Sequence, residues 1–121
     1  MPSKPPADFF HQGIELFNAG RFFECHEAWE EVWLRAEGGE KLFLQGMIQA
    51  AAAILHAQRG NLEGVRTLRD KSLEKLDRCG AACRGIALDE LRDALRKYFE
   101  TVLRSDAARL PATPRIRRLP R

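Results

Sequence analysis

The stretch FFECHEAWEEVW, residues 22–33, is the part of the sequence that decides the fold. At about 100° per residue, a helix through it gathers its tryptophans and apolar side chains on one broad face. His26 falls on the margin of that face, and Glu30 falls beside it one turn later. Three other glutamates fall on the far side: Glu24, Glu27 and Glu31. The pattern predicts a half-buried helix whose tryptophans enter a protein core.

The same helical period runs through most of the chain, and no alternating strand pattern competes with it. Glycines and prolines divide the sequence into five expected helices, at residues 6–19, 21–36, 40–59, 61–78 and 88–105. The stretch CGAACRG between the fourth and fifth is interpreted as a linker. Because the connections are short, consecutive helices should pack antiparallel. The sequence therefore predicts an all-α antiparallel bundle of about five helices.

A weak internal repeat relates the glycine turns at Gly20 and Gly60. Aligning them pairs Phe22 with Leu62. A helix that ends in glycine, with a large apolar residue two positions later, is similar to the turn of helical-hairpin repeats such as the tetratricopeptide. Two ordinary glycine-capped helices give the same pattern. The bundle is therefore expected to be only weakly tetratricopeptide-like.

Length and composition favour an ordinary globular domain. The chain has 121 residues, of which 45% are hydrophobic and 31% charged, enough for one domain with a sizeable core. The N-terminus lacks the apolar region of a secretory signal, and the apolar stretch at residues 42–55 is too short to span a bilayer. Three cysteines argue against a secreted disulfide framework. We therefore expect a cytoplasmic protein without a membrane span.

The basic charge is concentrated at the C-terminal end. Residues 107–121 contain five arginines and no acidic residue, so the net charge of +3 for the whole chain leaves −2 for residues 1–106. Three prolines and the lack of helical period predict a flexible Arg/Pro-rich tail at 107–121 after a single helical domain at 1–106. Nucleic acid is an expected partner only through this tail.

The third expected helix contributes polar residues that suit those of the second. Its sequence is apolar almost all round, yet Gln45, Gln49 and His56 share one line. A buried polar group without a partner costs about 1–3 kcal/mol, so two such helices should pair their polar lines. The prediction is one cluster that forms a ligand pocket between the two helices, with tryptophans as walls. Its members are His26, Glu30, Trp29, Trp33, Gln45, Gln49 and His56.

These motifs resemble a family of small prokaryotic and plastid-type helical proteins, catalogued as domain of unknown function three-zero-nine. The resemblance covers residues 9–76, in which a glycine turn precedes an aromatic pair and a Glu-x-His-Glu motif, and a Gln-Gly-x-Ile-Gln segment precedes a Gly-Asn turn. Cys25 stands where the family usually has a small apolar residue. The matching residues are Phe22, Phe23, Glu24, His26, Glu27, Trp29, Trp33, Gln45, Gly46, Ile48 and Gln49. The resemblance implies an all-helical bundle and no particular activity or cofactor.

The chemistry of the cluster leaves more than one interpretation open. A binding or interaction module for a small molecule or a protein partner is the first. A metal-dependent or acid–base enzyme that uses His26 and Glu30 is the alternative, although no nucleophile with an orienting triad accompanies them. A polar network that fixes helix register is a third. Whether the protein is an enzyme is uncertain, its cofactors are unknown, and we assign no metal site. Cys79 and Cys83 are interpreted as surface thiols.

Overall fold

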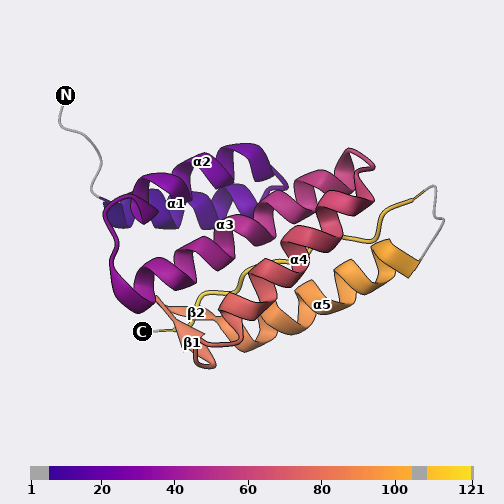
Figure 1. The fold of residues 1–121 in the computed structure, drawn as a ribbon. Coiled ribbons are helices and arrows are strands. Elements are labelled where there is room, and N and C mark those ends of the chain that lie inside the picture. Colours follow the sequence, from indigo (N-terminus) through magenta and orange to yellow (C-terminus); the bar gives the residue numbers. More distant parts are fainter. Residues whose placement is uncertain (1–5, 105–108, 121) are drawn as a thin grey trace.

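The computed structural model describes residues 6–104 and 109–120 (Figure 1). This part of the chain contains five helices: α1 (Pro6–Asn18), α2 (Phe22–Trp33), α3 (Gly38–Gln58), α4 (Leu62–Leu76) and α5 (Leu88–Arg104). The predicted all-α bundle of five helices is confirmed. Residue 105, the expected end of the fifth helix, lies outside the described residues. No helix within them is both long enough and apolar enough to cross a membrane.

The helices form a row in which each packs mainly against the next one in sequence. Figure 1 shows this order, from α1 and α2 through α3 and α4 to α5. The predicted turns at Gly20 and Gly60 have φ values of +80° and +75°, a conformation that glycine adopts without strain. These turns reverse the chain between α1 and α2 and between α3 and α4.

Trp29 fixes α2 against α1. Its side chain is fully buried, and its indole Nε1–H donates a hydrogen bond of 3.1 Å to the carbonyl oxygen of Phe10. The ring lies so close to the backbone of α1 that a Cβ added at Gly13 would be 2.2 Å from Nε1. Phe10 and Phe17 stack on the same ring. The interface between α1 and α2 therefore depends on the packing of the large Trp29 ring against Gly13, which has no side chain.

A second close approach holds α4 on α3. The buried hydroxyl of Ser72 donates to the carbonyl oxygen of Gly46 at 2.9 Å. A Cβ at Gly46 would come within 2.9 Å of the Leu76 side chain. Because α2 covers one side of α3 and α4 covers another, a line of half-exposed side chains remains along the length of α3. Polar members of that line are Gln45, Gln49 and His56.

The expected linker between α4 and α5 contains a short hairpin. Strands β1 (Ala82–Cys83) and β2 (Ile86–Ala87) pair antiparallel, with Ala82 opposite Ala87 and Cys83 opposite Ile86. The two turn residues between them, Arg84 and Gly85, have φ values of 50° and 76°, as a two-residue hairpin turn with two positive φ angles requires. Strands of two residues carry no alternating pattern, so the sequence could not predict them.

Residues 109–120 run in an extended conformation along the bundle. The side chain of Asn18 makes two hydrogen bonds to the backbone of Ile116: its Nδ2–H donates to the carbonyl at 2.9 Å, and its Oδ1 accepts from the amide at 2.7 Å. Ile116 is buried, and the Leu119 N–H donates to the Gly85 carbonyl at 2.8 Å. No regular element was expected here, and only an isolated bridge between Ile86 and Arg118 forms. The flexibility expected for 107–121 stays a prediction, and residues 107, 108 and 121 lie outside the described ranges.

Candidate functional site

His26 and Glu30 form the predicted pair on α2. His26 Nε2 lies 3.1 Å from Glu30 Oε1, and the two side chains are 31% and 49% exposed. One helical turn separates them, which brings the two side chains together on the surface of the helix. The pair is partly in water, which weakens the interaction between its two groups.

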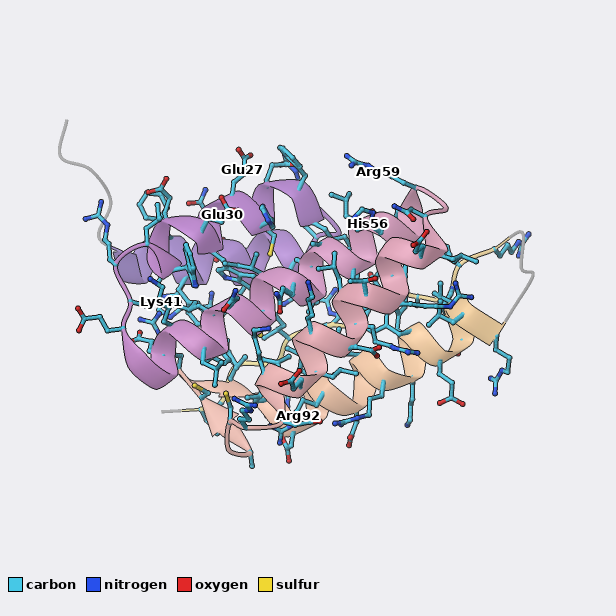
Figure 2. All side chains as sticks on the ribbon, viewed as in Figure 1. Glu27, Glu30, Lys41, His56, Arg59 and Arg92 are labelled. Carbon is cyan, nitrogen blue, oxygen red and sulfur yellow. The ribbon has the colours of Figure 1, made fainter. Side chains whose placement is uncertain are left out.

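Trp33 lies one turn beyond Trp29 on the same helix, in a different environment. It is half-buried, and the Lys41 ammonium at the start of α3 lies 4.4 Å from its ring centroid, within the range of a cation–π interaction. Figure 2 shows Lys41 at that end of α3. The buried indole Nε1–H of Trp33 has no hydrogen-bond partner among the described residues. Trp33 thus brings an unpaired donor to the boundary between α2 and α3.

The two glutamines lie on the half-exposed line of α3. The carbonyl oxygen Oε1 of Gln49 is buried, and it has no hydrogen-bond partner in the described part of the chain. That His26 and Glu30 lie within hydrogen-bonding or water-bridged reach of Gln45 or Gln49 stays a prediction. We refer to His26, Glu30, Trp33, Gln45 and Gln49 together as the α2–α3 seam.

His56 lies elsewhere, at the turn from α3 to α4. Its Nδ1 is 3.1 Å from Asn61 Nδ2, and a Cβ added at Gly64 would be 2.8 Å from its Cγ. Figure 2 shows it near the end of α3 that joins α4. Asn61 caps α4 by accepting a hydrogen bond from the Gly64 N–H at 3.0 Å. A hollow of about 350 Å³ is lined by His56, Asn61, Glu63, Gly64, Thr67 and Leu68. The structure therefore brings His56 to α4 and not to the seam.

The other reactive side chains offer little chemistry at neutral pH. Burial raises the pKa of the Cys25 thiol far above its ordinary value, so this sulfur stays protonated and is a poor nucleophile. Burial also raises the pKa values of Cys79 and Cys83, both of which are half-buried. Within residues 6–104 and 109–120, no three His, Cys, Asp or Glu side chains are grouped closely enough to hold a metal ion.

A hollow between α1 and α2 was not predicted. It encloses about 420 Å³ and is lined by Phe9, Gln12, Leu16, Arg21, Glu24, Glu27, Ala28 and Glu31. The sequence contains a signal for it, because Phe9, Gln12 and Leu16 share one face of α1 at helical spacing. The three glutamates assigned to the solvent side of α2 border this hollow.

Comparison with known proteins relates most of this chain to bacterial proteins. Residues 10–68, from α1 into α4, match the family model described as "Domain of unknown function (DUF309)". Over 103 residues the chain is 33% identical to "Uncharacterized protein YpuF" of Bacillus subtilis (strain 168), covering 80% of this chain and 59% of that protein. Over 98 residues it is 32% identical to an "Uncharacterized protein" of Aquifex aeolicus (strain VF5), covering 80% and 28%. This chain thus spans less than two thirds of either relative.

Proposed function

Through residues 10–68 the chain belongs to the DUF309 family, and from this premise we propose that it is a small helical binding module. Its site is the α2–α3 seam. The printed names of its relatives carry no activity that could be transferred. The support for the proposal therefore comes from the geometry of the seam alone. A cytoplasmic location, expected from the sequence, belongs to the same proposal.

One observation carries this proposal: the seam has a buried donor and a buried acceptor that lack partners within the described chain. They are Trp33 Nε1–H on α2 and Gln49 Oε1 on α3. Leaving such a group unpaired costs about 1–3 kcal/mol. A network that served only to fix helix register would pair them, as the Ser72 hydroxyl is paired with Gly46. Polar groups kept at a cost to stability are characteristic of binding sites.

The unpaired groups also indicate what the module binds. Amide groups carry both a carbonyl acceptor and an N–H donor, the kinds of group that the indole N–H of Trp33 and the carbonyl of Gln49 each lack. The half-exposed ring of Trp33 supplies an apolar wall, and His26 and Glu30 supply polar groups at its edge. An aromatic wall with a few convergent polar groups is a common composition for a ligand site. The proposed ligand is thus an amide, in a small molecule or in a peptide segment of a protein partner.

The alternative, a metal-dependent or acid–base enzyme, is supported by the His26–Glu30 pair alone. A histidine hydrogen-bonded to a carboxylate can act as a general base. In the part of the chain that the structure describes, no third His, Cys, Asp or Glu side chain joins this pair closely enough to share a metal ion. The binding module is therefore the function that the seam supports better.

A nuclear magnetic resonance titration of ¹⁵N-labelled protein with N-methylacetamide and short blocked peptides tests the proposal. The indole signal of Trp33 and the side-chain amide signals of Gln49 should shift, while the indole of Trp29, bonded to Phe10, should stay fixed. Trp33→Phe and Gln49→Leu should each abolish the response at the other residue. Equal shifts at both indoles, or none at the seam, would contradict the proposal.

A further inference from the structure

We propose that the outer surface of α2, with the hollow between α1 and α2, docks a basic segment of another protein. This surface, here called the acidic groove, is formed by Phe9, Leu16, Phe23, Glu24, Glu27, Ala28, Glu31 and Leu34. Its hollow opens between α1 and α2, whereas the α2–α3 seam borders α3, and only the seam carries the binding function proposed above. The acidic groove is therefore a second surface, next to the first.

The groove has an apolar floor. Phe9 and Leu16 of α1 are only half-buried although they pack against the core, and Ala28 of α2, which lines the same hollow, is 7% exposed. Together with a polar rim of Gln12, Arg21 and three glutamates they line an open hollow of about 420 Å³. This volume is large enough to accept apolar side chains of a docked segment.

Two exposed apolar side chains lie outside the hollow, on the outer face of α2 and just beyond its end. Phe23 is 52% exposed and Leu34 is 64% exposed. They are eleven residues apart, about three helical turns, so they lie on one line along the helix. Each is ordinary by itself, but together they place an apolar side chain at either end of the row of glutamates, where a docked segment can bury it.

The rim determines the charge of the partner. Between Phe22 and Trp33, α2 contains four glutamates and no lysine or arginine. Glu24 pairs with Arg21 and Glu30 with His26. Glu27 and Glu31 are exposed and have no cationic partner among the described residues, and Figure 2 shows Glu27 on the outer side of α2. A negative rim around an apolar floor is complementary to a segment in which basic residues flank apolar ones.

The molecule binds a segment of this chemistry elsewhere on its own surface. Arg117 pairs with Glu90 of α5 at 2.7 Å, and Arg118 lies 3.8 Å from Glu15 of α1. Ile116, beside these arginines, is buried. Carboxylates on helices thus hold the arginines while the neighbouring apolar side chain is inserted. The acidic groove offers the same two elements to a segment of another chain.

Fluorescence anisotropy with a labelled synthetic peptide tests the proposal. The probe is an amphipathic helix as long as α2, with leucines at helical spacing and lysines elsewhere, and the control peptide has glutamates in place of the lysines. The lysine peptide should bind, more weakly as salt increases, and the glutamate peptide should not. The double variant Glu27→Lys with Glu31→Lys should weaken binding by roughly tenfold or more, and Phe23→Ser with Leu34→Ser by several-fold.

A matched variant separates docking from unspecific attraction. Asp70→Lys with Glu74→Lys changes the net charge of the protein equally, at the same spacing, on the exposed surface of α4. It should leave the affinity within about twofold. All of these positions are exposed, so circular dichroism and thermal melting should show that the variants fold.

Three results would overturn the proposal. An equal loss of affinity in the α4 variant would show that only net charge matters. Loss in Trp33→Phe with none in the groove variants would move the peptide to the seam. Concentration-dependent dimerisation that the Glu27 and Glu31 changes abolish would make a second copy of this chain the occupant.

Discussion

Trp29 and Trp33 lie one turn apart on α2, yet they differ in almost every property except residue type. Trp29 is fully buried and stacks on two phenylalanines, and its indole N–H donates a hydrogen bond to the carbonyl oxygen of Phe10. Trp33 is half-buried, faces Lys41, and its indole hydrogen has no partner among the described residues. The difference shows that hydrogen bonding and burial, more than residue type, separate the core of this molecule from its candidate site.

Truncating each tryptophan should give the largest effect. Trp29→Ala removes a fully buried ring and should lower the free energy of unfolding by about 3–5 kcal/mol. Trp33→Ala should lower it by about 1 kcal/mol, because part of that ring already contacts water. Urea denaturation of the two variants measures the difference. Similar losses would show that both tryptophans belong to the core.

Gly13→Ala tests the surface that Trp29 packs on. The new Cβ would lie 2.2 Å from the indole nitrogen, so the ring or α1 must move, at a cost of about 1–3 kcal/mol. Gly39→Ala in α3 is the matched control, because nothing lies within 4 Å of its added Cβ. The control should be neutral or slightly stabilising. If Gly13→Ala behaves like the control in urea denaturation, Trp29 is not held against α1 as described.

Gln49→Leu tests the unpaired acceptor of the seam. Replacing a buried oxygen that has no partner with an apolar group of similar shape should leave stability unchanged or raise it by up to about 1 kcal/mol. Ser72→Ala provides the contrast, because it breaks the hydrogen bond to Gly46 and should lower stability by about 1 kcal/mol. Thermal and urea melts compare the two. A loss from Gln49→Leu as large as that from Ser72→Ala would reveal a bound partner such as an ordered water.

His26→Ala should have the smallest effect on stability. The sequence, which places this side chain at the margin of a buried face, predicts a loss of about 1–3 kcal/mol. The observed exposure of the pair lowers the expectation to about 0.5 kcal/mol or less. Glu30→Gln, which removes the charge and keeps the shape, should cost no more. If urea denaturation showed that either variant loses more than about 1 kcal/mol of unfolding free energy, the pair would belong to the core with Trp29.

The helices could be predicted because their determinants are local. Gly20 and Gly60 adopt the positive φ values that end helices, and apolar side chains recur at the helical period between them. The hairpin at Ala82–Ala87 could not, since each strand has only two residues. The pairing of Asn18 with Ile116 joins residues 98 positions apart, and no periodic pattern encodes such a contact.

The candidate site could be predicted only in part. The spacing of His26 and Glu30 identifies their pair, because both belong to one helix. A helical wheel places Gln49 and His56 on one line of α3, but it does not show which neighbouring helix each of them meets. The glycine inside α1 was the available signal that Trp29 is structural, since a glycine within a helix often marks a close approach.

The contacts of Ile116 and Arg117 have a consequence for how the molecule unfolds. In a row of helices that pack mainly against their neighbours, either terminal helix can detach while the rest stays folded. Here one short segment bonds Asn18 of α1 and Glu90 of α5. Detaching either terminal helix also breaks contacts that involve the other. Ile116 and Arg117 thereby couple α1 with α5, so that hydrogen exchange in the two helices should proceed as one cooperative unit.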